Sequence, residues 1–123
     1  MSQTRVAFYG FALVYLLGVV VQFFLAGLAL FGTGDYETHR WLGYVLALIS
    51  AVLVGIAIGA KMARSLTALS TVLVALNALQ IALVEIDIQE IQALHVVNAL
   101  AIAFVANMLV HRSRRYLASK MAT

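Results

Sequence analysis

Two histidines within strongly apolar segments are the residues of this chain best suited to chemistry. His39 lies in the stretch DYETHRWLGY, and His95 lies in LHVVNA. Imidazole nitrogen binds zinc, iron and copper, and an ionisable group inside a long apolar segment is costly and is usually functional. We therefore predict that His39 and His95 ligate a metal ion or a metal-containing cofactor.

Four apolar runs must position these histidines. The chain has 123 residues, of which 64% are hydrophobic and 11% charged, and its mean hydropathy is +1.02. This composition is far more apolar than that of a soluble domain, and each run approaches the ~20 residues with which a helix crosses a bilayer. The sequence therefore predicts an all-α integral membrane protein with helices at about residues 5–32, 36–61, 65–86 and 88–113.

The connections between the predicted helices are short, and the chain contains no proline to interrupt them. Short connections make successive helices antiparallel neighbours, so we expect an up-down-up-down four-helix bundle that forms one domain over residues 1–123. The chain also has no cysteine, which excludes disulfides, iron–sulfur clusters and cysteine-zinc sites.

Charge placement predicts the orientation of this bundle. Seven bases fall at the termini and in the second loop: Arg5, Lys61, Arg64, Arg112, Arg114, Arg115 and Lys120. The acids fall in or beside the first and third loops: Asp35, Glu37, Glu85, Asp87 and Glu90. The positive-inside rule then makes both termini cytoplasmic. We expect a multi-pass protein of a prokaryotic plasma (inner) membrane, whose basic tail contacts anionic lipid and not nucleic acid.

Helix starts predict the depth of each histidine. Asp35 would cap the second helix and put His39 about one turn inside, while Asp87 with Glu90 would form a capping box and put His95 about two turns inside. The two parallel helices should lie on a diagonal of the bundle, about 11–14 Å apart if neighbouring axes are 8–10 Å apart. Two imidazoles can reach one shared central atom over that span.

Small residues lie one turn from each histidine on the same helix face. Gly43 follows His39 by four positions, and Ala99 follows His95 by four. The two histidines are 56 residues apart, so these pairs occupy matching places in two halves of the chain. A flat macrocycle bound by both imidazoles needs such bare surfaces, although small residues also serve close helix packing.

The segment HRWLGY, residues 39–44, resembles the His-Arg-x-Leu-Gly helix start of membrane b-type cytochromes and ferric-reductase-like transmembrane domains. The resemblance implies that His39 is a haem ligand. The HRxLG pattern, together with LHxxNA at residues 94–99, also looks like that of a family of small four-helix bacterial membrane proteins without an assigned activity. Larger haem domains often carry a second histidine deeper on the same helix. Residues 46–55 contain none, so we expect one haem and not two.

The chemistry of the remaining side chains is compatible with haem b held by His39 and His95. Two axial imidazoles favour electron transfer over ligand binding at the iron. Arg40 would pair with a haem propionate, with Glu37 or with a lipid phosphate. Three polar residues would either bond neighbouring helices, accept the second imidazole N–H or bind a quinone oxygen: Gln22, Gln80 and Asn98.

Three functions from different classes fit the sequence. The first is a single-haem membrane cytochrome that exchanges electrons with a quinone or a redox partner protein, more an electron-transfer or accessory subunit than a self-sufficient enzyme. The second is a divalent-metal site in which loop carboxylates, Glu37, Glu85 or Glu90, join the two histidines. The third is a cofactor-free anchor or assembly subunit of a homodimer or larger membrane complex, for which Gly55 and Gly59 would provide close helix contacts.

Overall fold

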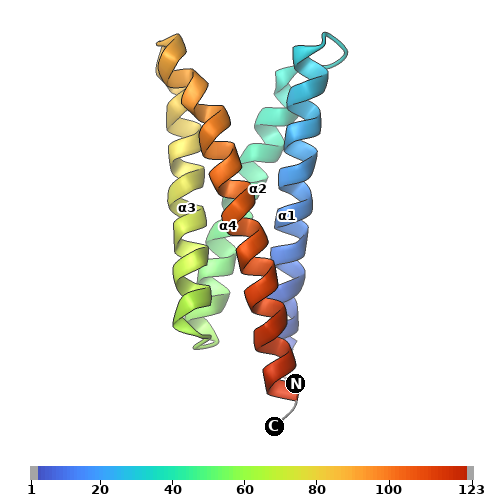
Figure 1. The fold of residues 1–123 in the computed structure, drawn as a ribbon, viewed down its shortest axis with the longest axis vertical. Coiled ribbons are helices and arrows are strands. Elements are labelled where there is room, and N and C mark those ends of the chain that lie inside the picture. Colours follow the sequence, from blue (N-terminus) through green and yellow to red (C-terminus); the bar gives the residue numbers. More distant parts are fainter. Residues whose placement is uncertain (1–2, 122–123) are drawn as a thin grey trace.

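The computed structural model describes residues 3–121, which form four α-helices: α1 (Gln3–Leu30), α2 (Tyr36–Gly59), α3 (Arg64–Glu85) and α4 (Gln89–Met121) (Figure 1). The all-α class is confirmed, and seven of the eight predicted helix ends lie within two residues of the observed ones. Of the predicted domain, residues 1–2 and 122–123 lie outside the described residues.

The predicted end of the fourth helix at residue 113 is wrong, because α4 continues for eight more residues to Met121. No glycine or proline interrupts the segment after Val110. The helix also keeps one side buried there. Ser113 is almost fully buried, Tyr116 packs against the core, and the Arg5 guanidinium of α1 lies 5.6 Å from the Tyr116 ring centre.

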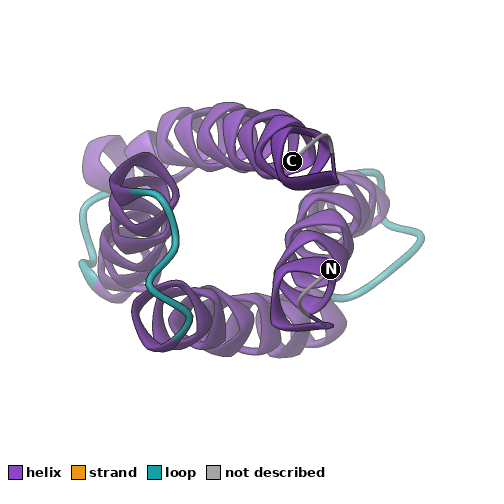
Figure 2. Cartoon of the chain, turned by 90° about the horizontal axis from the view of Figure 1, so that it is seen from below, coloured by secondary structure: helices purple, strands orange, loops and turns teal. Residues whose placement is uncertain are grey.

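The helices contact one another in a ring, α1 with α2, α2 with α3, α3 with α4, and α4 with α1, while the two diagonal pairs make no close backbone contact. Figure 2 shows this arrangement along the bundle axis. The termini and the α2–α3 loop lie at one end, and the other two loops lie at the opposite end (Figure 1). The predicted up-down-up-down order and the diagonal placement of α2 and α4 are therefore confirmed.

Local sequence features mark the end of α1 and the beginning of α2. Gly32, with φ of 74°, ends α1: its N–H donates to Ala29 O, and the Thr33 N–H donates to Leu28 O. Asp35 then caps α2 by accepting bonds from the N–H groups of Glu37 and Thr38.

The predicted capping box at the start of α4 is wrong. This helix begins at Gln89, two residues after Asp87, and within residues 3–121 the Asp87 side chain accepts no capping bond. Its main-chain start is made instead by Ile88, whose carbonyl accepts from Ile91 and Gln92.

The two ends of the bundle differ in packing. At the end with the termini, buried apolar side chains close the interior, among them Phe8, Leu53, Leu66, Leu73 and Leu109. Toward the other end, the α1–α2 hairpin and the α3–α4 hairpin diverge (Figure 1). A cavity lined by both histidines lies toward this end.

All four helices are long and apolar enough to cross a membrane. Their outward sides carry large apolar residues, such as Leu17, Leu48 and Phe104, each more than 60% exposed. A soluble protein rarely exposes such extended apolar surfaces, whereas a lipid environment satisfies them.

Candidate functional site

His39 and His95 lie close together at the wider end of the bundle and line the same cavity. His39 lies one turn into α2, and His95 lies nearly two turns into α4. Their ring centres are 6.2 Å apart, and the ring planes differ by 56°. Two helices that make no close backbone contact thus bring their imidazoles close together.

Both rings are oriented by a main-chain carbonyl of the preceding helix. His39 Nδ1 lies 3.2 Å from Gln22 O on α1, and His95 Nδ1 lies 3.1 Å from Gln80 O on α3. A carbonyl oxygen can only accept, so Nδ1 carries the proton and donates in both histidines. Each hairpin therefore presents one imidazole in the same tautomer. The matching positions of His39 and His95 in the two halves of the chain thus correspond to matching hydrogen bonds.

This tautomer leaves the Nε2 lone pair of each ring available as a ligand. Within residues 3–121, no hydrogen bond joins the two rings or engages either Nε2 atom. If ring nitrogens lie about 1.1 Å from the ring centre and metal–nitrogen bonds measure about 2.0–2.1 Å, as at zinc, two imidazoles on opposite sides of one metal have centres ~6.3 Å apart. The observed 6.2 Å fits that spacing.

The histidines line a partly open cavity of about 1030 Å³ to which all four helices contribute residues. Its volume reaches the upper end of the ~300–1,000 Å³ range of small-molecule and cofactor sites. The cavity brings together every site residue predicted from the sequence: His39, Arg40, Gly43, His95 and Ala99. Most of the remaining lining is apolar, including Val19, Leu46 and Ile102.

Gly43 and Ala99 lie in this cavity, as a bare surface requires. A Cβ atom added at Gly43 would lie 3.0 Å from the side-chain nitrogen of Gln22 and meet nothing else within 4 Å. Only the flexible end of one side chain therefore limits the space at Gly43. On α4, Ala99 contributes only a methyl group to the cavity lining.

Gln80 and Asn98 form hydrogen bonds between α3 and α4, which confirms the first alternative predicted for them, whereas the alternative in which side-chain amides accept the imidazole N–H groups is wrong. The imidazole N–H groups are accepted by the main-chain carbonyls of Gln22 and Gln80, not by their side-chain amides. Gln80 Nε2 instead donates to His95 O at 3.0 Å, and Asn98 Nδ2 donates to Gln80 Oε1 at 2.5 Å and to Leu76 O at 2.9 Å. Gln22 has no equivalent network, and its Oε1 is buried without a partner among residues 3–121.

Charged groups are sparse around the histidine pair. Arg40 and Glu85 line the cavity. Of the three carboxylates that the divalent-metal hypothesis offered as alternative ligands, Glu85 lines the cavity, whereas Glu37 and Glu90 do not. Within residues 3–121, no three His, Asp or Glu side chains gather in a group that could hold a metal ion. The geometry therefore favours a centre with two protein ligands.

Sequence reasoning missed the floor of the cavity. Asn77 Nδ2 of α3 donates to the Tyr15 hydroxyl of α1 at 2.6 Å, and also to Leu73 O at 2.8 Å. Tyr15 lies seven residues before Gln22, so both residues occupy one helix face. The seven-residue spacing could have placed Tyr15 on the same helix face as Gln22, but a tyrosine within an apolar run gives no indication of its hydrogen-bond partner.

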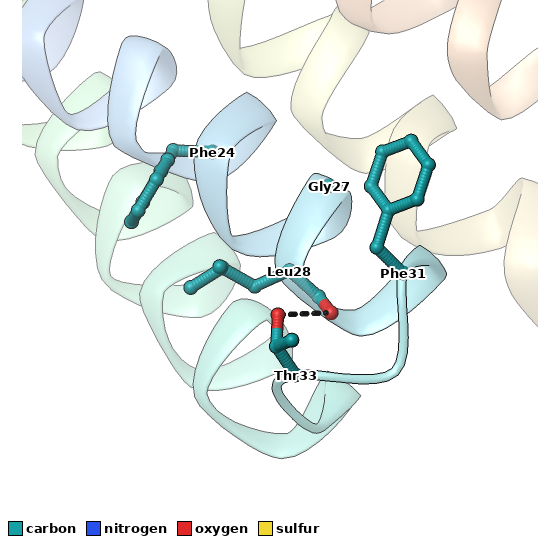
Figure 3. A pocket seen from close by; sticks show the side chains of 5 residues that line it. All are labelled: Phe24, Gly27, Leu28, Phe31 and Thr33. Atoms are coloured by element: carbon teal, nitrogen blue, oxygen red, sulfur yellow. Dashed lines mark hydrogen bonds between the residues drawn. The ribbon is translucent and has the colours of Figure 1, made fainter.

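A second hollow lies at the end of α1, where Thr33 Oγ1 donates to Leu28 O at 3.2 Å (Figure 3). It measures about 260 Å³ and is lined by Phe24, Gly27, Leu28, Phe31 and Thr33. None of these side chains is titratable, so this hollow offers no chemistry comparable to that of the histidine cavity.

Comparisons with known proteins add a family but no activity. A family model described as "Family of unknown function (DUF6220)" matches residues 22–86, just over half of the chain. The matched range includes Gln22, His39 and Gln80, and His95 follows it. No curated protein and no solved structure matches the chain.

Proposed function

Because the chain belongs to this family of unknown function, we propose its function from its own site: a membrane protein that binds one haem b between His39 and His95 and transfers electrons. One observation carries the proposal. The two imidazoles lie close together, with ring centres 6.2 Å apart, and both direct Nδ1 to a backbone carbonyl. Metal-ligating histidines commonly donate their other N–H to such an acceptor.

The cavity supports a macrocycle better than a bare ion. Two protein ligands complete the coordination of a haem iron, whereas zinc sites recruit three or four protein ligands. Gly43 and Ala99 leave space one turn below the histidines, and the surrounding wall is largely apolar. The Arg40 guanidinium also lines the cavity, where it would hold a propionate by charge-assisted hydrogen bonds.

The expected chemistry follows from the ligand set. Haem supplies a one-electron redox centre, and two imidazoles that occupy both axial positions favour electron transfer. This chain's residues contribute the fixed imidazole tautomers and a cavity closed below by Tyr15 and Asn77. The donor or acceptor would be a quinone or a redox partner protein that reaches the wider end of the bundle.

We further propose that the bundle spans a prokaryotic plasma membrane with both termini in the cytoplasm. Support comes from the separation of charge along its axis. Seven bases lie toward the end with the termini, and all five acids lie toward the end with the histidines. One haem near the outer face leaves much of the ~30 Å hydrocarbon core unbridged. The chain alone would therefore exchange electrons at one side and not carry them across.

A visible spectrum of the detergent-purified protein, produced with adequate haem supply, tests the proposal. We expect a Soret band and sharp α and β bands after dithionite reduction, as six-coordinate low-spin haem b gives. The double variant His39→Ala/His95→Ala should be colourless, whereas His111→Ala, at the other end of α4, should retain the spectrum. A colourless wild-type protein would refute haem binding and favour an anchor or assembly subunit, and metal analysis would then test for a bound ion.

A further inference from the structure

We infer, resting on the proposed haem function, that the two histidines are unequal. His95 is the anchoring ligand, and His39 is an exchangeable ligand that a small uncharged diatomic molecule replaces. The inference adds an activity to electron transfer, namely the binding of an external ligand at the His39 side of the site.

Two hydrogen bonds to Gln80 hold His95, and a third bond holds Gln80 itself. The ring Nδ1–H of His95 donates to Gln80 O at 3.1 Å, and its main-chain carbonyl accepts from Gln80 Nε2 at 3.0 Å. Asn98, one turn farther along α4, holds the same glutamine by donating to Gln80 Oε1. A displacement of His95 would break both bonds between α3 and α4 at this level, so the ligand is fixed in place.

His39 has a weaker support. Its ring makes a single hydrogen bond, 3.2 Å to Gln22 O, and it lies only one turn from the start of α2. The Gln80 side chain forms hydrogen bonds with α4, but the Gln22 side chain forms no such bond with α2, and its Oε1 has no partner among residues 3–121. One hydrogen bond and an edge-to-face contact with the Tyr36 ring, whose centre lies 6.4 Å away in the same first turn of α2, restrain this ligand.

The space beside His39 suits a small incoming molecule with an amide nearby. Gly43 carries no side chain, and the Gln22 side-chain nitrogen is the only group within 4 Å of a Cβ built there. Gln22 Nε2 is a neutral donor that would bond to the outer atom of a diatomic ligand. Arg40 and Glu85, the charged residues that line the cavity within residues 3–121, carry opposite charges, so burial of an additional anion would leave one charge uncompensated and an uncharged ligand is favoured.

The exchange transfers no electrons. When haem is bound, His39 Nε2 would release the metal and keep its lone pair, and the incoming ligand would bind in its place with a lone pair of its own. His39 retains its Nδ1 proton throughout, because Gln22 O continues to accept it. The reaction is therefore reversible and needs no oxidant, reductant or proton donor.

Carbon monoxide added to the dithionite-reduced protein is the probe. His39→Ala should keep haem in a five-coordinate form and bind carbon monoxide faster than the wild type, since no internal ligand competes. His95→Ala should lower haem affinity by more than about 100-fold. Removal of a group that only supports a metal ligand lowers affinity by up to about 100-fold, and this variant removes the ligand itself. Equal haem loss in the two variants, or retention only in His95→Ala, would overturn the inference.

A milder pair of variants makes the same comparison without deleting a ligand. Asn98→Ala releases Gln80 and should speed haem transfer to apomyoglobin by about tenfold, as loss of outer partners at metal sites does. Gln22→Ala preserves the main-chain acceptor of His39 but removes the amide donor, so it should speed carbon monoxide dissociation and speed haem transfer less than Asn98→Ala does. The opposite pattern would contradict the assignment. Circular dichroism and gel filtration verify that each variant is folded.

The failure of this inference differs from the failure of the proposed function. A wild-type protein without a Soret band refutes haem binding itself. A wild-type protein with a low-spin spectrum that excludes carbon monoxide, and that depends equally on both histidines, preserves the electron-transfer proposal and refutes the unequal roles.

Discussion

The Tyr15 hydroxyl and the Asn77 side-chain amide form a 2.6 Å hydrogen bond that crosses the bundle from α1 to α3. These two helices are diagonal and make no close backbone contact. Tyr15 is fully buried and lines the lower part of the histidine cavity. The bond therefore separates the open cavity from the packed core and ties the two hairpins together beneath the site.

Tyr15→Phe should lower the free energy of unfolding by about 1 kcal/mol, because the variant keeps the ring but removes the acceptor of a buried donor. Thermal unfolding followed by circular dichroism in detergent measures this change. Tyr9→Phe is the matched control, since the Tyr9 ring packs against the core and its hydroxyl makes no hydrogen bond within residues 3–121. Equal stability of the two variants would contradict a role for the diagonal bond.

Ala99→Phe should prevent haem binding, because a ring at this position fills the space one turn below His95. A larger side chain in a well-packed interior typically costs about 1–3 kcal/mol of stability. Here the new ring would occupy the cavity, so the protein stays folded but the haem is excluded. Leu100→Phe is the neighbouring control, since Leu100 is 60% exposed on the outer surface. Haem titration followed at the Soret band compares them, and similar haem content in both would show that Ala99 does not border the macrocycle.

Arg40→Gln should lower the haem reduction potential by a few tens of millivolts. A positive charge near the iron favours the reduced form, and a unit charge ~10 Å away contributes on the order of 1 kcal/mol at an effective dielectric constant of ~20. A spectroelectrochemical titration determines the midpoint. Arg64→Gln removes a base at the opposite end of the bundle, so its potential should match that of the wild type. A shift of the same size in both variants would reflect net charge and not proximity.

Asp35→Ala should destabilise the protein by about 1 kcal/mol, because the side chain satisfies two main-chain N–H groups at the start of α2. Asp87→Ala removes an acid at the same end of the bundle. Because Asp87 caps no helix, this change should have little effect on stability. Thermal unfolding distinguishes the two. A larger loss in Asp87→Ala would indicate that α4 is capped in the way that the capping-box pattern predicted.

The helix pattern and the site residues were accessible from sequence because both follow from local rules. Apolar runs of membrane-spanning length predicted the helices, and Asp35 indicated the start of α2. The four-residue spacing of His39 with Gly43 and of His95 with Ala99 placed each pair on one helix face. The end of α4 was mispredicted because loss of apolar character was taken as the end of the helix, whereas Ser113 and Tyr116 continue to pack.

By itself, the sequence determined the all-α class, the number of helices, their alternating direction and some of the residues that line the cavity, since periodicity and charge encode these features along the chain. Only the tertiary structure decided the distance between His39 and His95, the main-chain acceptors of their N–H groups and the bond from Tyr15 to Asn77. Carbonyl oxygens are present in every residue, so no sequence pattern marks the ones that accept. They become specific only when two helices pack in one register.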